Sequence, residues 1–471
     1  MRVRLTVGWV ILLSLVAAIG YAQTPMAAPG APPAPAAVPQ QAAPTLGLAE
    51  ALDIARRNNP TFRQVQNNRT PASRNLLNAT TAMFTPTLSL NGNYYWSDAG
   101  TNFVQGTNLS YTGPTSSQTS GSLNLRYSLS GATFTSRGLA AAELRATDQD
   151  ISGAEILLTT GVRAQYLNTL EAQAQAGVAR RAVERVSEQL NLARARYSVG
   201  QGTLIDVRRA EVDKGTADVT LLRADQAAEN QTLILYNQMG VPAPTVPRVT
   251  LTDSFPVVAP QWQIDSLLTL AATRNPGLLS LRAREASARW ASRATRSEYL
   301  PSLFLSAGTG RTGLHTDAFN APDPNNPGQF IPVPARDEWS TNPWGVNVGL
   351  SLPIYDQFSR YARTAEASAR EDDLRQQARA RELQVRSDVV QAFNTLQAAF
   401  VAVGLQLTNK TASAEALELA TQRYRVGSGS YLELLDARTA ADRADTDYIS
   451  AVYGYHRAIA TLEQAVGRPL R

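Results

Sequence analysis

The acidic side chains best placed for chemistry lie beside two glycine turns. Asp206 follows the first turn, and Glu433 and Asp436 follow the second. Carboxylates gathered in a narrow aqueous passage repel one another and attract cations. The same residues also suit helix capping, because each lies near a helix N-terminus, whose dipole favours negative charge. Both interpretations stay open for Asp206 and Glu433, and the position of Asp436 one turn deeper favours a functional role.

The residue sets of common catalytic and metal sites are missing from the chain. It has no cysteine, and its two histidines are His315, in a Gly/Pro-rich stretch that we expect to be a loop, and His456, in an expected helix. A thiolate zinc site and a Ser-His-Asp arrangement are therefore excluded. Glycine pairs such as Gly308 and Gly310 lack the strand and helix context of a nucleotide-binding loop. We predict no enzyme activity, no cofactor and no metal.

The two glycine turns are copies of one sequence. Residues 196–206 read Arg-Tyr-Ser-Val-Gly-Gln-Gly-Thr-Leu-Ile-Asp, and residues 423–433 read Arg-Tyr-Arg-Val-Gly-Ser-Gly-Ser-Tyr-Leu-Glu. In each copy a Thr or Ser precedes an acidic residue by three positions, the spacing of a capping box at a new helix start. We expect the glycines to adopt the positive φ that ends a helix. The turn glycines are Gly200, Gly202, Gly427 and Gly429.

A coiled-coil seam leads into the first turn. Its apolar residues follow a 4-3-4-3-4 spacing, which is the period of helices packed side by side. They are Ala179, Val183, Val186, Leu190, Ala193 and Tyr197. Tyr424 occupies the position of Tyr197 in the second copy. We expect both tyrosines to pack in the seam, and a contact at a tip gate is the alternative.

Long helices must position these turns. No proline occurs between Pro114 and Pro242 or between Pro353 and Pro469. The first stretch predicts a helix of roughly 60 residues, about 90 Å long at the helical rise per residue. The predicted helices are 48–60, 60–83 with an irregularity at Pro71, 136–197, 203–239, 264–275, 276–297, one from about 359 to the second turn, and 431–466. Because two short helices together match one long helix in length, we expect them to stack end to end beside it.

Four segments alternate between apolar and polar residues with the period of a strand. They are 85–96, 123–130, 300–307 and 344–354, and 97–120 and 308–343 are expected to be loops. About eleven residues of alternation suffice for one tilted crossing of a bilayer. The aromatic residues Tyr94, Tyr95, Trp96, Trp339 and Trp344 cluster near the strand ends, as in an interfacial girdle. The alternative is a half-buried sheet of a soluble protein.

The N-terminus resembles an export signal. Residues 1–22 contain Arg2 and Arg4, an apolar run and a small-x-small ending, so we predict a cleaved signal peptide, with an uncleaved anchor as the alternative. Residues 23–45 are Pro/Ala-rich and predict a disordered tether. We divide the rest into repeat 1 (46–241), a linker (242–262) and repeat 2 (263–471), and no segment after residue 22 is expected to cross a membrane as a helix. Basic residues alternate with acidic ones along the helices, which argues against nucleic-acid binding.

These motifs, in this order and twice over, resemble the TolC-type outer-membrane efflux proteins. The resemblance rests on Asn-Pro after each first helix, a Pro-initiated strand, Leu352-Pro353-Ile354-Tyr355-Asp356, Tyr-x-Val-Gly and the acidic turn. It implies an α+β membrane protein: a homotrimer with a 12-stranded β-barrel, four strands per chain, continued by a long α-helical coiled-coil barrel. Two tandem repeats would build each chain. Repeat 1 departs from the pattern, because Ser128 stands where repeat 2 has Pro353.

The resemblance also implies location, function and partners. The protein would be the outer-membrane exit duct of a tripartite efflux or type I secretion system, with its helical part in the periplasm. A periplasmic adaptor, an inner-membrane pump and outer-membrane lipid would be its partners, with docking at the tip turns. In related channels acidic side chains at the positions of Glu433 and Asp436 line the tip constriction, whereas a basic residue that ties the closed tip together is replaced here by Gly429.

Part of this follows from physics alone. Four strands per chain leave two open edges, and an unpaired edge cannot face lipid, so several chains must share one barrel. The alternative function is a periplasmic coiled-coil scaffold or adaptor with a small soluble sheet. Adaptors usually have a lipoyl-like or barrel domain between their helical arms, and no such block occurs in the sequence.

Overall fold

The computed structural model describes residues 45–103, 110–244, 249–253, 255–323, 325–326 and 328–470. These residues belong to one compact unit. The predicted signal peptide (1–22) and all but the last residue of the predicted tether (23–45) lie outside the described residues.

Each half of the chain follows the same order of helix, strand pair and long helical hairpin. The helices are α1 (Leu48–Asn58), α2 (Pro60–Asn67), α3 (Arg69–Thr81), α4 (Gly131–Ser198), α5 (Leu204–Met239), α6 (Ile264–Arg274), α7 (Pro276–Ser297), α8 (Ser359–Val426) and α9 (Tyr431–Val466). The long strands are β2 (Thr87–Ser97), β5 (Ser116–Leu129), β7 (Ser302–Thr316) and β10 (Arg336–Ser351). The short strands are β1 (Thr45–Leu46), β3 (Thr101–Phe103), β4 (Ser110–Thr112), β6 (Thr250–Leu251), β8 (Phe319–Pro322) and β9 (Phe330–Val333). The expected helices and four main strands are therefore present.

The four long strands form one antiparallel sheet in the order β10-β7-β5-β2. Its register aligns the apolar residues across all four strands: Leu88 pairs with Leu125, Leu125 with Ala307, and Ala307 with Val346. Directly paired residues share a face of the sheet, so one face is apolar along its whole width. The opposite face has mainly Ser, Asn and Gly at the intervening positions, with Arg126 and Phe304 among the exceptions. This arrangement suits lipid on one side and water on the other.

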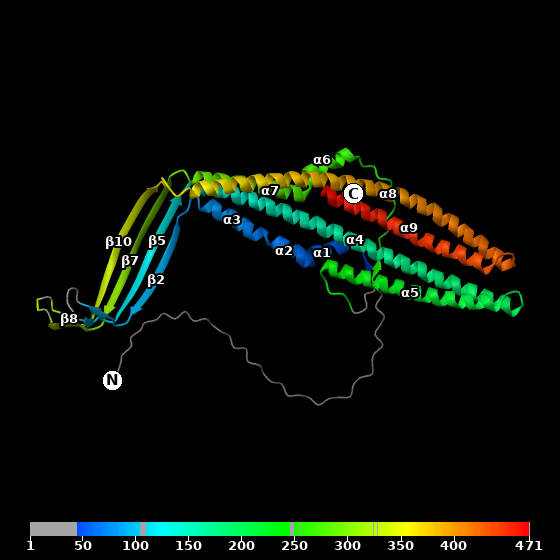
Figure 1. The fold of residues 1–471 in the computed structure, drawn as a ribbon, viewed down its shortest axis with the longest axis horizontal. Helices are drawn as coiled ribbons and strands as arrows, with labels where there is room; N and C mark the ends of the chain where they lie inside the picture. Colours follow the sequence, from blue (N-terminus) through cyan, green and yellow to red (C-terminus); the bar gives the residue numbers. More distant parts are fainter. Residues whose placement is uncertain are drawn as a thin grey trace, which may run out of the picture. The chain divides into compact units, whose positions relative to one another are not determined.

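Each of the four long strands is continued by a helix, and a strand together with its helix forms one row of the molecule. Contacts run from α3 to α4, α4 to α7 and α7 to α8, which is the order of β2, β5, β7 and β10 (Figure 1). Nearer the turns, α5 and α9 take the places of α3 and α7, with α4 contacting both and α8 contacting α9. One chain is therefore a layer four elements wide along its length. Its outer rows are β2, α3 and α5 on one side and β10 and α8 on the other.

The expected end-to-end stacking is present and depends on two asparagines. Asn59 caps α2 by accepting a hydrogen bond from the amide of Phe62 (3.0 Å), and its side chain donates to the carbonyl of Gln238 in α5 (2.9 Å). Asn275 does the same in repeat 2: it caps α7 and contacts the end of α9. Gly240 and Gly467 end α5 and α9 with positive φ and lie against these asparagines, where a Cβ atom would come within 2.7 Å of the main chain.

Three predictions need correction. The expected loop 308–343 is largely strand, because β7 extends to Thr316 and β10 begins at Arg336, and the loop 97–120 contains β3, β4 and the start of β5. The small residues that suggested a loop allow strands to approach large side chains: the indole of Trp339 lies over Gly313, within 2.7 Å of where a Cβ would be. His315 therefore lies in β7 rather than in a loop.

The second and third corrections concern helices. The irregularity expected at Pro71 is at Asn68, between α2 and α3, because proline is tolerated in the first turn of a helix but not one turn further in. By length and composition α8 passes as a possible membrane-crossing helix, the one that does so among the described residues, although none was expected after residue 22. Its buried side packs on α6, α7 and α9.

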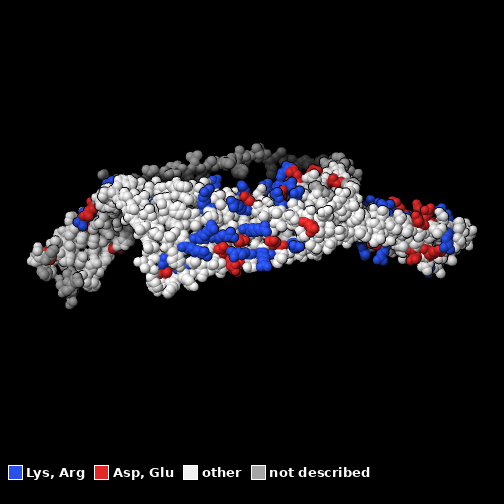
Figure 2. Space-filling model, turned by 90° about the horizontal axis from the view of Figure 1, so that it is seen from above, with Lys and Arg blue, Asp and Glu red and all other residues white. Residues whose placement is uncertain are grey.

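On one face of the molecule, charged side chains gather on the helices and are sparse next to the sheet (Figure 2). On the face in Figure 2, Lys and Arg alternate with Asp and Glu along the helical part, whereas the zone beside the strands is almost free of colour. Many of these charges form ion pairs between rows, such as Arg282 with Glu382 (3.1 Å). The basic residues are therefore interspersed with acidic ones, as predicted.

Candidate functional site

The first glycine turn joins α4 to α5 and contains the predicted capping box. The hydroxyl of Thr203 accepts a hydrogen bond from the amide of Asp206 (3.3 Å). The Asp206 carboxylate in turn accepts from the amide (3.3 Å) and the hydroxyl (2.8 Å) of Thr203. The Asp206 carboxylate is thus part of the N-terminal cap of α5.

The second turn joins α8 to α9 and differs in its acidic residue. Ser430 caps α9 by accepting from the amide of Glu433 (3.2 Å), but the Glu433 carboxylate forms an ion pair with Arg423. Asp436 is exposed, and its carboxylate has no hydrogen-bond or ion-pair partner among the described residues. Of the three predicted acidic site residues, Asp436 has the side chain most available for another role.

The four turn glycines serve two purposes. Gly200 (φ +76°) and Gly427 (φ +83°) adopt the left-handed conformation, as expected. Gly202 and Gly429 do not, which corrects the prediction of positive φ for all four. They are needed for close approach to the preceding helix: a Cβ at Gly202 would lie 3.2 Å from the amide nitrogen of Tyr197, and one at Gly429 would lie 3.1 Å from the Cβ of Arg423.

The two tyrosines of the repeated motif have different environments. Tyr424 is buried and forms an edge-to-face contact with Tyr431, with ring centroids 5.8 Å apart. Both rings belong to an apolar cluster with Leu190 and Ala193 of the seam, so this cluster joins the two hairpins. Tyr197 is 47% exposed. The seam is therefore packed as far as Ala193, and the packing expected for both tyrosines is found at Tyr424 alone.

Arg196 links the hairpins, a role that the sequence did not indicate. It donates to the carbonyl of Tyr424, and to that of Gln201 at 3.1 Å, while its guanidinium lies 4.8 Å from the centre of the Tyr424 ring. Its counterpart Arg423 contacts Glu433 within its own hairpin. Because both copies have an arginine at this position, the sequence gave no indication that Arg196 and Arg423 would have different partners.

A second link between the hairpins involves Asp213, Tyr431 and Arg438. The Tyr431 hydroxyl donates to the Asp213 carboxylate at 2.7 Å, and Arg438 lies 3.6 Å from the same carboxylate. Arg438 is buried and also donates to the side chain of Gln189 (3.2 Å). Burial raises the pKa of Tyr431, and the hydrogen bond to Asp213 raises it further. None of these four residues was singled out from the sequence, because their spacing has no local signature.

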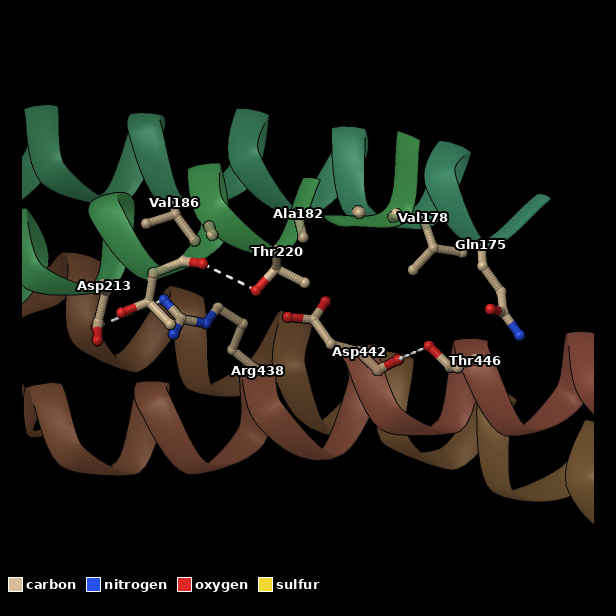
Figure 3. Close-up of a pocket in the computed structure, with 13 residues that line it drawn as sticks. Gln175, Val178, Ala182, Val186, Asp213, Thr220, Arg438, Asp442 and Thr446 are labelled. Carbon is tan, nitrogen blue, oxygen red and sulfur yellow. Dashed lines mark hydrogen bonds and ion pairs between the residues drawn. The ribbon is translucent and has the colours of Figure 1, made fainter. Parts of the chain in front are cut away.

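Asp213 and Arg438 lie at one end of a cavity of about 330 Å³ between α4, α5 and α9 (Figure 3). Its α4 wall contains Val178, Ala182 and Val186. Ion pairs also join α4 to α9: Arg185 pairs with Asp442, which lines the cavity, Glu171 pairs with Arg457, and Arg163 pairs with Glu463. Apart from the apolar cluster at Tyr424 and Tyr431, the contact between the hairpins along α4 and α9 is thus polar, in contrast to the mainly apolar packing within each repeat.

The two histidines lie in different elements, His315 in β7 and His456 in α9. His315 contacts Asp337 (2.6 Å) and Asp317 (3.2 Å), and His456 is buried with its Nε2 atom 3.1 Å from the carbonyl of Phe255. No group of three or more His, Cys, Asp or Glu residues that could hold a metal ion occurs in the described part of the chain.

The repeated hairpins, the apolar sheet face and the tip turns agree with one protein family. The family model described as outer membrane efflux protein matches residues 51–241 and 267–468. The chain belongs to this family. Each matched range contains one copy of the helix, strand pair and hairpin.

Relatives and solved structures agree with this membership. Outer membrane protein TolC of Escherichia coli K12 is 25% identical over 427 residues, which is 89% of this chain and 82% of TolC. Outer membrane efflux protein BepC of Brucella suis is 23% identical over 305 residues, 65% of this chain and 62% of BepC, so that match spans less than two thirds of BepC. The structure of the outer-membrane channel OprN matches with a TM-score of 0.71 at 19% identity and covers 89% of both chains, which shows the shared fold.

The resemblance inferred from the turn motif is therefore confirmed. This chain is an efflux protein of the outer membrane. The family is one of transport proteins rather than enzymes. Membership also sets aside the alternative of a periplasmic scaffold or adaptor.

Proposed function

We propose that three copies of this efflux protein close into one ring, a 12-stranded barrel continued by a helical tunnel, which conducts substrates from periplasm to exterior. The sheet order supports ring closure. β2 and β10 are the outer strands, each with a single neighbour in the sheet. Because an open strand edge in lipid leaves main-chain groups without partners, β2 of one copy must pair with β10 of the next.

The helical rows support the same closure. The outer rows expose large apolar side chains that a single chain leaves uncovered. On α5 these are Leu204, Ile205, Val212, Val219 and Leu222, and on α8 they are Leu383, Val401, Leu405, Leu419 and Val426. The two faces belong to opposite edges of the protomer, so they meet when copies join edge to edge in a closed ring. The number three rests on the family resemblance.

The tip is the proposed gate. In a ring of three copies, Asp206, Glu433 and Asp436 would bring their carboxylates to a narrow mouth, where they would attract cations. The tip turns, at Tyr197, Gly200, Gly202, Tyr424, Gly427 and Gly429, are the proposed docking region for a periplasmic adaptor that connects the channel to an inner-membrane pump. The proposed domain division is a signal peptide (1–22), a tether (23–45), repeat 1 (46–241), a linker (242–262) and repeat 2 (263–471). The mature chain would start at Gln23.

Cross-linking tests the ring, since the chain has no native cysteine. Asn91→Cys in β2 combined with Asn347→Cys in β10 places one thiol on each sheet edge, and neighbouring positions in β10 sample the register between copies. Oxidation in membranes should give covalent dimers and trimers and no larger species. The control pair Asn91→Cys and Ser122→Cys, which face each other within one sheet, should give cross-linked monomers. Monomers from every edge pair, or ladders beyond trimer, would contradict the ring.

A further inference from the structure

A cavity of about 460 Å³ lies where the sheet meets the helices, away from the tip. Its lining comes from three neighbouring rows: the start of α4, the connection from α7 to β7, and the connection from β10 to α8. The lining residues Ser302 and Ser351 pair with each other and adjoin Leu303 and Leu350 of the apolar face. Because neighbouring strand residues point to opposite faces, the two serines lie on the polar face. In the proposed ring that face lines the channel, so the position of the cavity rests on the proposed function.

Arg360 is the key side chain of this cavity. It is 7% exposed, and its Nε atom donates to the Asp356 carboxylate at 3.0 Å. Its guanidinium lies 4.8 Å from the centre of the Tyr299 ring, which supports it from one side. The two Nη atoms have no hydrogen-bond partner among the described residues, yet they are not sealed from solvent. A stacked arginine with a free edge can bind a carboxylate or phosphate with two parallel hydrogen bonds.

Two helix N-termini add to the positive electrostatic potential in the cavity. α4 begins at Gly131 and α8 at Ser359, and the first turns of both line the cavity. Side chains already cap both first turns: the Thr133 amide of α4 donates to the Ser130 hydroxyl (3.4 Å), and the Arg360 amide of α8 donates to the Asp356 carboxylate (2.9 Å). The contribution of the two N-termini is therefore that of their helix dipoles, which favour an anion. Gly131 also allows α4 to start this close to α7, because a Cβ there would lie 2.2 Å from the Cβ of Ser297.

The other charged groups of the cavity compensate one another. Arg363 pairs with Glu298 at 2.7 Å, and Asp356 accepts from Arg360. These two acidic and two basic side chains sum to zero. The unused donors of Arg360 and the two helix N-termini therefore decide which ligand the cavity favours.

We propose that this cavity binds the carboxylate or phosphate group of an organic acid passing through the channel, one site per copy. Arg360 supplies the fork, and the first turns of α4 and α8 supply the positive potential. The site would hold acidic substrates briefly at the passage from the helical tunnel into the barrel. Organic acids would accordingly be a substrate class of the proposed channel.

The test uses the purified full-length trimer in detergent, checked for assembly before any binding measurement. Titration calorimetry and thermal midpoints are measured with phenyl phosphate and with inorganic phosphate, at an ionic strength matched with chloride. Arg360→Lys keeps the charge but removes the fork. Ser302→Asp leaves Arg360 in place and puts a carboxylate in the cavity. Arg379→Lys, at an exposed arginine of α8 without an ion pair among the described residues, is the matched control.

Phenyl phosphate should bind to the wild type and to Arg379→Lys with equal affinity. Its affinity for Arg360→Lys and for Ser302→Asp should be lower by about tenfold or more. Equal binding to all four proteins, or no binding to an intact wild-type trimer, would overturn the site. Binding of inorganic phosphate without phenyl phosphate would overturn the organic-acid assignment. A protein that forms no trimer would instead count against the proposed ring, so the two failures are distinguishable.

Discussion

The side-chain amide of Asn275 donates a hydrogen bond of 2.9 Å to the main-chain carbonyl of Ala465. With its oxygen the same side chain caps α7 by accepting from the amide of Leu278 (3.1 Å). One buried residue thus starts one helix and satisfies the end of another. It holds α7 and α9 end to end beside α8.

Replacing Asn275 tests this stacking. Asn275→Ala should lower the free energy of unfolding by about 2–3 kcal/mol, because it removes the cap and leaves a carbonyl without a partner. Asn275→Ser keeps a capping oxygen but is too short to reach Ala465, so about 1 kcal/mol of loss is expected. Denaturant unfolding of the detergent trimer measures both. Equal losses would mean that the contact with Ala465 contributes nothing.

The link made by Arg196 predicts asymmetry between equivalent residues. Arg196→Ala should weaken the contact between hairpins by about 1–2 kcal/mol, since a charged hydrogen-bond donor to Tyr424 and its ring contact are lost. Hydrogen exchange in the last turn of α8 should become faster, and the channel should spend more time in its high-conductance state.

Arg423→Ala is the matched control, because Arg423 occupies the same position in the second copy and pairs within its own hairpin. That pair is largely exposed, so a loss of about 0–1 kcal/mol and unchanged gating are expected. Identical behaviour of the two variants would contradict a special role for Arg196.

Alkaline pH should loosen the tip through Tyr431. Burial and the hydrogen bond to Asp213 raise the pKa of Tyr431 above its ordinary value of 10.0. The stabilising effect is complete below about pH 10 and is lost as pH rises further, because the unfolded chain then releases the proton first. Stability measured from pH 8 to 11 should fall at the alkaline end. Tyr431→Phe should show a shallower fall, and Tyr197→Phe, at an exposed tyrosine, should match the wild type.

The acidic residues of the tip should affect ion selectivity to different extents. Asp436→Asn should lower cation selectivity and weaken block by multivalent cations more than Glu433→Gln does. The reason is that the Asp436 carboxylate has no partner in the described part of the chain, whereas Glu433 is paired with Arg423. Replacing Glu433 and Asp436 together by Ala should give the largest change in single-channel recordings.

Asp206→Asn separates capping from gating, because it weakens the box with Thr203. It should lower stability by about 1 kcal/mol and change selectivity least. Unchanged selectivity in all of these variants, together with lower melting temperatures, would assign the acidic residues to helix capping alone.

The amino-acid sequence by itself determined the repeated order of elements. Proline-free stretches, Asn-Pro starts and glycine turns act on neighbouring residues, so α4, α5, α8 and α9 were predicted close to their observed ends. The period of two placed the apolar residues of each strand on one face, and the register joined them across the sheet. These features depend on local geometry, which a single stretch of chain contains.

Only the tertiary structure decided which side chains meet between rows. The copied motif has the same Arg and Tyr in both halves, yet Arg196 reaches the other hairpin while Arg423 stays within its own, and Tyr424 is buried while Tyr197 is exposed. The cavity at Arg360 likewise combines three connections that are far apart in sequence. Such contacts follow from how rows of different repeats lie side by side. The repeat makes the two copies alike, whereas their neighbours in the layer are different, and burial and pairing depend on the neighbours.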